Sequence, residues 1–206
     1  MQAAGVALLD RIGVSGVWYL TSPSSSHATA FKPVILLTHS QSGEYGWPLG
    51  DARPSKVRAI IAIEPAGPPF ANAVFAPTGP ARPYGVSEIP LTFSPPIKSP
   101  SDLRPVVVSS DPSTNFMCLQ QGTKPPRKLV NLAHIPVLFV TSQSSYHAVY
   151  DDCSAQFLQE AGVSVKHVHL EDIGIFGNGH MMFMEMNNIQ IAEEVVETWI
   201  TENLGK

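Results

Sequence analysis

Ser40 follows an apolar run and precedes small and polar residues, a setting in which a serine can act as a nucleophile. The stretch 34–43 reads VILLTHSQSG, in which four apolar residues lead toward the serine and a glycine follows. A strand, a sharp turn carrying serine and a helix form a nucleophile elbow, with Thr38 and Ser42 here in the positions usually held by glycine. The helix would direct backbone N–H groups at an oxyanion formed beside it. The alternative is a buried strand followed by an ordinary Ser/Gly turn.

His180 is the candidate base, because a serine hydroxyl needs a neighbouring group that takes its proton. It lies in the stretch 174–182, GIFGNGHMM, after the last expected strand and before the last expected helix. Three glycines in this stretch indicate a loop whose backbone takes unusual conformations to place the histidine side chain. The alternative is a histidine that backbone hydrogen bonds hold in a glycine-rich loop.

Glu64 is the candidate for the acid that orients this base. It ends the apolar strand expected over 57–63, directly after the elbow helix, and that strand should neighbour the elbow strand in a sheet. A carboxylate at the end of a buried strand is costly to desolvate unless it is paired, and an imidazole is a suitable partner. Asp151 and Asp152 are the alternatives, and their other interpretation is favourable charge at a helix N-terminus.

Several histidine, aromatic and methionine side chains are candidates for the surroundings of Ser40. The pocket candidates are His39, Tyr146, His147, Phe176 and Met181. His39 is expected to pack below the elbow, whereas His147 begins a helix near the end of the sheet. His167 and His169 share one face of an edge strand and are expected to be solvated, without a metal-binding spacing. The sequence therefore predicts no metal ion and no cofactor.

Alternating strands and helices predict a parallel α/β sheet. Strands are expected over 34–38, 57–63, 135–141 and 163–170, and helices over 3–12, 41–51, 127–133, 147–161 and 187–203. Fourteen of the 19 prolines lie within 65–126. Because proline lacks an N–H and fixes φ, this Pro-rich segment should form neither regular sheet nor long helix, apart from a short extended piece near 104–108. We expect the Pro-rich segment to cover the site as a cap or lid.

Composition limits the class of protein. With 206 residues, of which 44% are hydrophobic and 15% charged, the chain can form one globular domain with a sizeable core. A net charge of -4 leaves no electrostatic footprint for nucleic acid, and no basic cluster suggests a membrane surface. No apolar run approaches the ~18 residues of a transmembrane helix. The N-terminus lacks the basic segment of a signal peptide, so a cytoplasmic location is the default. Homo-oligomer formation stays open.

The two cysteines do not form a recognisable framework. Cys118 and Cys153 lie 35 positions apart, which is neither a disulfide-rich pattern nor a metal-site spacing. We expect two free buried thiols, with a single bridge as the alternative.

Four blocks along the chain, in this order, resemble a group of bacterial and fungal α/β-hydrolase esterases. The blocks read THSQSG over 38–43, AIEPAGPPF over 62–70, IPLT over 89–92 and GNGHMM over 177–182. In that group the acid follows the strand after the nucleophile, as Glu64 does here. The resemblance implies Ser40 as the nucleophile, His180 as the base and Glu64 as the acid. It also implies the backbone N–H of Gln41 as one oxyanion donor.

The N-terminal part departs from that group in two ways. The group's domain has several more strands before its elbow, which bring the second oxyanion donor, whereas here only a helix precedes residue 13. Residues 14–33 then separate that helix from the elbow strand with a Ser-rich segment and a short strand expected over 14–20. We therefore hypothesise an N-terminally truncated gene product in which 14–33 is an atypical insertion, such as an intron read as coding sequence. A spliced transcript lacking this block would support the hypothesis, and an uninterrupted, translated one would refute it.

The resemblance implies a single α/β-hydrolase domain over 1–206, corresponding to the C-terminal part of that fold. Such a domain would cleave a small carboxylic ester through an acyl-serine intermediate. Loss of one oxyanion donor costs ~10²–10³ in kcat, so the activity would be weakened. The alternatives are a catalytically silent protein that acts by association and a hydrolase of lactones or thioesters. The apolar candidates for the pocket lining suggest an apolar acyl group; they are Phe70, Tyr146, Phe176, Met181 and Met182.

Overall fold

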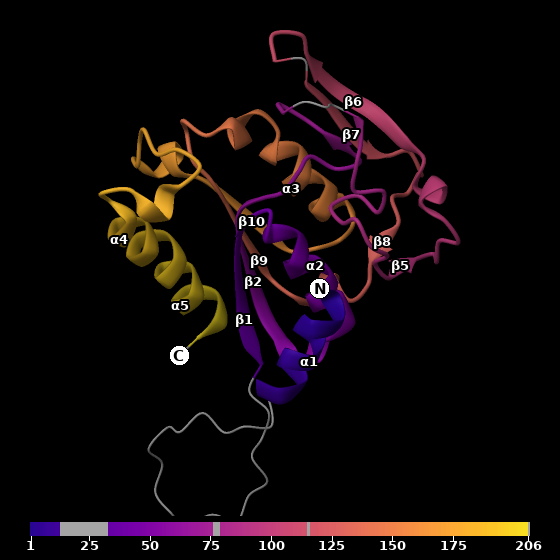
Figure 1. Ribbon diagram of the computed structural model, residues 1–206, viewed down its shortest axis with the longest axis horizontal. Helices are drawn as coiled ribbons and strands as arrows, with labels where there is room; N and C mark the ends of the chain where they lie inside the picture. The colour runs from indigo at the N-terminus through magenta and orange to yellow at the C-terminus, as the bar shows by residue number, and fades with distance from the viewer. Residues whose placement is uncertain (13–32, 76–78, 115, 206) are drawn as a thin grey trace, which may run out of the picture.

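A parallel four-stranded sheet forms the centre of the protein. The computed structural model describes residues 1–12, 33–75, 79–114 and 116–205. The strand expected over 14–20 and nearly all of the expected insertion lie outside the described residues. The strands of the sheet are β1 (Val34–Ser40), β2 (Val57–Pro65), β9 (Val137–Thr141) and β10 (Val165–His169), in the spatial order β1-β2-β9-β10 (Figure 1). All neighbouring strands run parallel, which confirms the predicted α/β sheet and the edge position of its last strand.

Helices cover both faces of this sheet (Figure 1). They are α1 (Gln2–Ile12), α2 (Gly43–Ala52) and α3 (Asp151–Glu160) on one face, and α4 (Asn188–Ile191), a π-helical turn (Ala192–Glu197) and α5 (Thr198–Leu204) on the other. Alternate side chains of β2 point to the two layers: Ile60 packs in the cluster that contains Trp47 of α2, and Ile61 packs with Trp199 of α5. Burial on both faces explains why β2 reads as a continuous apolar run.

Short 3₁₀ turns join these elements. They span Pro54–Lys56, Pro100–Leu103, Leu132–His134, Tyr146–Val149, Leu170–Ile173 and Met182–Met184.

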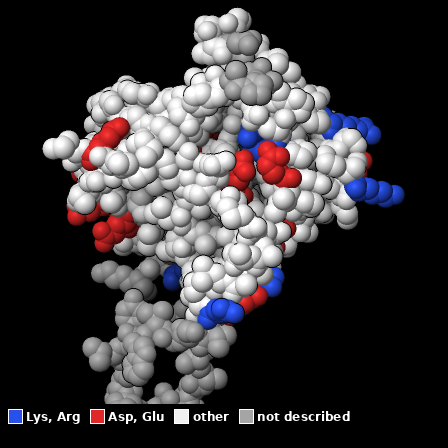
Figure 2. Space-filling model, viewed as in Figure 1, with Lys and Arg blue, Asp and Glu red and all other residues white. Residues whose placement is uncertain are grey.

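Among the described residues no helix is long and apolar enough to cross a membrane. On the face that Figure 2 shows, acidic and basic side chains are sparse, as the low charged fraction of the sequence suggests.

The Pro-rich segment contains more regular sheet than its composition predicts. Its strands are β3 (Ala71–Asn72), β4 (Gly79–Pro80), β5 (Phe93–Ser94), β6 (Pro105–Asp111) and β7 (Phe116–Gln121). β6 and β7 form an antiparallel hairpin, so the expectation of no regular sheet is wrong here, whereas the extended piece near 104–108 is confirmed as part of β6. The prolines do not interrupt the hairpin, because Pro105 is the first residue of β6 and Pro112 follows its last.

Two helix predictions need correction. The helix expected over 127–133 is wrong, because this stretch forms the short strand β8 (Lys128–Leu129) and enters the 3₁₀ turn Leu132–His134. Leu129 pairs with Phe93 of β5 and is fully buried, so tertiary packing outweighs local helix propensity. The helix expected over 147–161 begins later, at Asp151, after a 3₁₀ turn.

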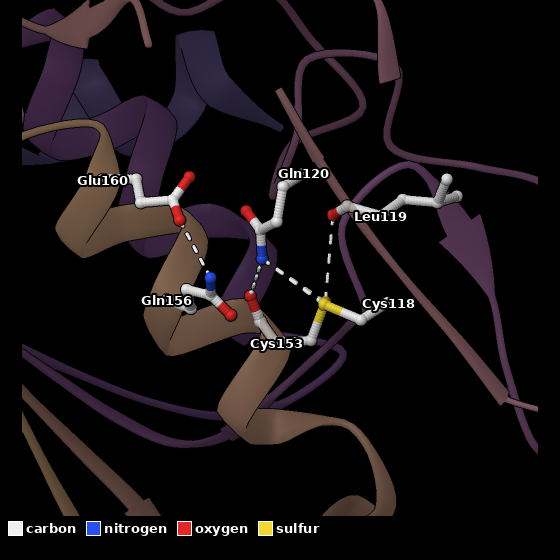
Figure 3. Close-up of a disulfide and its surroundings, with 6 residues drawn as sticks. All are labelled: Cys118, Leu119, Gln120, Cys153, Gln156 and Glu160. Carbon is white, nitrogen blue, oxygen red and sulfur yellow. Dashed lines mark hydrogen bonds between the residues drawn. A yellow bond between two sulfur atoms is a disulfide. The ribbon is translucent and has the colours of Figure 1, made fainter. Parts of the chain in front are cut away.

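A disulfide bond joins the hairpin to the main domain (Figure 3). Cys118 of β7 is bonded to Cys153 of α3, with Cα atoms 5.6 Å apart, so the expectation of two free thiols is wrong. The close packing of the hairpin against α3 brings the two residues within bonding range, and the sequence separation alone did not reveal it. The side-chain amide of Gln120 donates a hydrogen bond to the backbone carbonyl of Cys153 at 2.8 Å. The Pro-rich segment is therefore covalently attached beside the carboxyl ends of the strands.

Candidate active site

Ser40 lies at a tight turn between β1 and α2. Its φ of 55° is in the left-handed region, which costs a non-glycine residue on the order of 1–3 kcal/mol and which surrounding contacts must therefore impose. The hydroxyl of Ser42 accepts a hydrogen bond from the N–H of His39 at 3.0 Å and donates one to the carbonyl of His39 at 2.6 Å. A glycine at position 42 has no hydroxyl and could not make these bonds. Ser42 therefore stabilises the turn through its side chain.

Gly43, one position beyond the usual elbow glycine, is where the turn needs a residue without a side chain. A Cβ atom at Gly43 would lie 2.3 Å from the Cβ of Pro65 at the end of β2. The first turn of α2 therefore rests directly on the neighbouring strand. Within the described part of the chain, the backbone N–H of Gln41 donates to no backbone acceptor.

Three side chains from distant parts of the sequence form a continuous chain of hydrogen bonds. The Oγ atom of Ser40 lies 2.8 Å from Nε2 of His180, and Nδ1 of His180 lies 2.6 Å from Oε2 of Glu64. Both distances are within the range expected for a nucleophile, a base and an orienting acid. All three residues lie at the carboxyl ends of the parallel strands, where ligands of open α/β sheets bind.

Glu64 is held as a carboxylate by several donors. Its side chain is fully buried, and its backbone φ of 41° is also in the left-handed region. The Ser142 N–H donates to Oε1 at 2.8 Å, and the Ser145 hydroxyl donates to Oε2 at 2.7 Å. Burial acts to raise the pKa of Glu64, but hydrogen bonds from Ser142, Ser145 and His180 outweigh it, and the pKa is lowered. Sequence reasoning missed the two serines, although they directly follow a buried strand.

The loop that carries His180 is anchored on both sides. The N–H of Gly179 donates to Oε1 of Glu185 at 2.8 Å, and the carbonyl oxygen of Gly179 lies 3.0 Å from the hydroxyl of Ser142, which donates its proton to Oε1 of Glu64 at 2.5 Å. Nε2 of His39 lies 2.8 Å from the carbonyl oxygen of His180, and the two rings are 4.5 Å apart. His39 therefore supports the His180 loop, instead of packing below the elbow away from it.

His147 packs against the face of His180. The two rings are stacked 4.6 Å apart, with an angle of 6° between their planes. Burial lowers the pKa of His147 to about 4, so this ring is neutral at neutral pH and does not oppose positive charge on His180. Its Nδ1 lies 3.0 Å from Oδ1 of Asp151, and its Nε2 lies 3.1 Å from the hydroxyl of Tyr150. The hydroxyl of Tyr146 lies 3.2 Å from Nε2 of His180 on the pocket side.

A cavity of about 640 Å³ opens beside Ser40. From the main domain it is lined by Ser40, Gln41, Glu44, Tyr146, His147 and Tyr150. From the Pro-rich segment it is lined by Ala66, Gly67, Asn72, Ala73, Phe75, Pro80, Ala81, Arg82 and Glu88. Of the expected pocket residues, Tyr146 and His147 line this cavity and His39 does not. Phe176 and Met181 are exposed and do not line it.

The cavity is more polar than the expected apolar lining. Arg82 is buried in its wall, 3.7 Å from Glu44, and its backbone N–H donates to Glu88 at 2.8 Å. Phe70 and Met182, two further expected lining residues, are buried in the hydrophobic clusters on either side of the sheet. Of the five residues on which the expectation of an apolar acyl group rested, Tyr146 alone lines this cavity. Sequence reasoning missed the polar wall because Arg82 and Glu88 lie in the Pro-rich segment, far in sequence from Glu44.

The two alternative acids lie away from His180. Asp151 binds His147 and accepts a hydrogen bond from the Thr141 hydroxyl at 2.8 Å, while Asp152 lies beside His167 and His169. The expectation that both histidines are solvated is wrong for His167, whose side chain is 10% exposed. Glu64, His147 and His180 are close enough to share an ion, but Glu64 and His180 already bind each other.

Comparisons with known proteins identify a related fungal protein. The chain is 44% identical over 195 residues to the probable secreted lipase phiG of Fungal sp. (strain ATCC 74256), covering 94% of this chain and 48% of that protein. The chain thus spans about half the length of the curated relative that it matches. No family model matches the chain.

Solved structures of low sequence identity were also found. A novel bacterial esterase is 22% identical, with a TM-score of 0.48, and the match covers 83% of this chain and 38% of that one. The monoacylglycerol lipase of Paleococcus ferrophilus is 13% identical, with a TM-score of 0.47, over 98% of this chain and 74% of that one.

The architecture is that of the α/β-hydrolase fold. It has a parallel sheet with helices on both faces, and Ser40 lies at the strand-to-helix turn after β1. The chain is similar, over nearly its whole length, to part of a protein that is named a probable secreted lipase.

Proposed function

We propose that this chain hydrolyses carboxylic esters through an acyl-serine intermediate. Ser40 is the nucleophile, His180 the general base and acid, and Glu64 the group that orients His180. The observation that carries the proposal is the continuous chain from Ser40 through His180 to Glu64, with distances of 2.8 and 2.6 Å. The similarity to a probable secreted lipase supports the same class of reaction.

The geometry suggests how each step proceeds. Nε2 of His180 takes the proton of Ser40 as its Oγ attacks the ester carbonyl, and the resulting tetrahedral oxyanion accepts a hydrogen bond from the N–H of Gln41. His180 then protonates the leaving alcohol as the C–O bond breaks, which leaves the acyl group on Ser40. Water, deprotonated by His180, attacks this acyl-serine, and collapse of the second tetrahedral intermediate releases the acid and restores Ser40.

We further propose that the Pro-rich segment forms one wall of the substrate pocket. The disulfide between Cys118 and Cys153 attaches this segment to α3, and Asn72 and Arg82 from it line the cavity beside Ser40. A disulfide persists in an oxidising compartment, and the fungal relative is named as secreted, so we assign the protein to such a compartment in place of the cytoplasm.

Hydrolysis of a p-nitrophenyl ester tests the proposal. The wild-type protein should release p-nitrophenol, and Ser40→Ala should reduce the rate to that of the uncatalysed reaction. Ser164→Ala is the matched control, because its exposed side chain lies outside the site, and it should keep wild-type activity. Equal rates for the wild-type protein and Ser40→Ala, with both folded by circular dichroism, would refute the proposal. A panel of lactones and thioesters tests the alternative electrophiles with the same variants.

The second candidate function is association without catalysis. β1 pairs only with β2 among the described strands, and Leu37 of β1 is 58% exposed. An open sheet edge with an exposed apolar side chain favours pairing with another chain. Sedimentation of the wild-type protein, compared with Leu37→Lys, separates this function from hydrolysis: a complex that the variant abolishes, together with no esterase activity, would favour association.

A further inference from the structure

Two histidines and an aspartate converge on the side of the sheet opposite the β1 edge. His167 and His169 lie two residues apart on β10, so their side chains share one face of this edge strand. Asp152, in the first turn of α3, lies over both of them. Its Oδ1 atom is 3.3 Å from Nδ1 of His167 and 2.9 Å from Nε2 of His169, and the two rings are 4.2 Å apart.

Hydrogen bonds on the side of His167 away from Asp152 determine which of its two ring nitrogens carries the proton. When Asp151 is ionised, the Thr141 hydroxyl donates to its Oδ2 atom at 2.8 Å, and the Thr141 oxygen then accepts from Nε2 of His167, 2.9 Å away. In the neutral ring Nδ1 then carries a lone pair. This lone pair faces Oδ1 of Asp152. Two hydrogen-bond acceptors this close repel each other, and a cation between them would remove the repulsion.

We propose that Asp152, His167 and His169 bind one divalent transition-metal ion, and that Zn²⁺ is the ion whose preferred ligands they match. Zn²⁺ takes imidazole nitrogen and carboxylate oxygen at about 2.0–2.2 Å, so neighbouring ligand atoms in a tetrahedral site lie about 3.4 Å apart. The three ligand atoms here all lie within 4.8 Å of one another, and the Asp152 oxygen lies 3.3 and 2.9 Å from the two histidine nitrogens.

The surroundings of the three residues fit such a site. Thr141 orients His167 through the nitrogen that does not face the ion, which is the usual arrangement for a metal-binding histidine. The side chain of Asp152 is 75% exposed, so an ion can enter from solvent and keep a water molecule as its fourth ligand. The spacing H-x-H alone did not predict this site, because the third ligand comes from α3 and meets β10 only through the fold.

Metal binding by the metal-free protein tests this inference. Isothermal titration with Zn²⁺ should show one ion bound per chain, and Co²⁺ should produce the visible absorption of a tetrahedral complex. His169→Gln and Asp152→Asn should each weaken Zn²⁺ binding by at least about 100-fold, since even outer-shell changes cost about 10–100-fold. His134→Gln, which replaces an exposed histidine elsewhere, should bind as the wild-type protein does.

The outcomes separate this inference from the proposed esterase activity. Ser40→Ala should bind Zn²⁺ normally, because the metal ligands do not include the catalytic serine. Asp152→Asn changes an exposed side chain and should keep the fold, which circular dichroism checks, so lost binding in this variant supports the site. No saturable Zn²⁺ binding by the wild-type protein, or unchanged affinity in both ligand variants, would overturn it.

Discussion

Glu64→Gln is the substitution that should separate orientation of His180 from mere space filling. The amide is nearly isosteric with the carboxylate, but one of its two positions must carry the NH₂ group. The Ser142 N–H donates to Oε1 of Glu64, so the amide oxygen has to occupy that position. The NH₂ group then takes the position of Oε2, which lies 2.6 Å from Nδ1 of His180. His180 must present Nδ1 as an acceptor and carry its proton on Nε2, where it cannot accept the proton of Ser40.

The expected effect is large and confined to kcat. In serine proteases the equivalent acid-to-amide change, which also leaves the histidine in the wrong tautomer, reduces kcat about 10⁴-fold, equal to about 5.5 kcal/mol in the barrier. We predict a loss of about 10³–10⁴ in kcat for a p-nitrophenyl ester, with KM little changed. Glu193→Gln, which changes an exposed side chain in the π-helical turn Ala192–Glu197, is the control and should be fully active. More than a tenth of wild-type kcat in a folded Glu64→Gln protein would refute the assigned role.

Three further predictions concern stability. Gly43→Ala should lower the free energy of unfolding by about 1–3 kcal/mol in urea titrations, because its Cβ would overlap the end of β2, whereas Gly79→Ala should leave it unchanged. Replacing Cys118 and Cys153 by serine should cost about 4 kcal/mol, since the bridge closes a loop with a sequence separation of 35, and an unchanged urea midpoint would contradict this. Burial lowers the pKa of His147 from 6.5 to about 4, so only the unfolded chain binds this proton between those pH values. Stability should therefore fall by up to about 3 kcal/mol from pH 6.5 to pH 4, and less in His147→Gln; identical pH profiles for the two proteins would contradict it.

The sheet was predictable from local sequence because its signals are strong. β2 and β9 are continuous apolar runs bounded by turn residues, which is typical of strands buried on both faces. A helix lies between β1 and β2 and another between β9 and β10, so parallel pairing within each of these pairs followed from the chain order. The stretch 127–133 was assigned wrongly, because its conformation depends on pairing with β5, a contact that no local pattern reveals.

The candidate site was predictable only in part. The structure brings Ser40, Glu64 and His180 into contact, and the sequence pointed to them because each follows a strand or lies in a glycine-rich loop. Their role as a site stays a prediction. The supporting contacts from Ser142 and Ser145 depend on how the loop after β9 folds back onto Glu64. The cavity wall also depends on the path of the Pro-rich segment, which supplies lining residues such as Asn72 and Arg82 that no local pattern revealed, whereas Phe176 and Met181 lie outside the cavity.

Covalent labelling with a fluorophosphonate tests the central claim most directly, because the reagent phosphonylates a serine only where a base and an oxyanion site activate it. Mass spectrometry of the digested wild-type protein should place one adduct on Ser40. The adduct should be absent in Ser40→Ala and much slower to form in Glu64→Gln. A folded wild-type protein that acquires no adduct, or acquires it on another serine, would contradict the account.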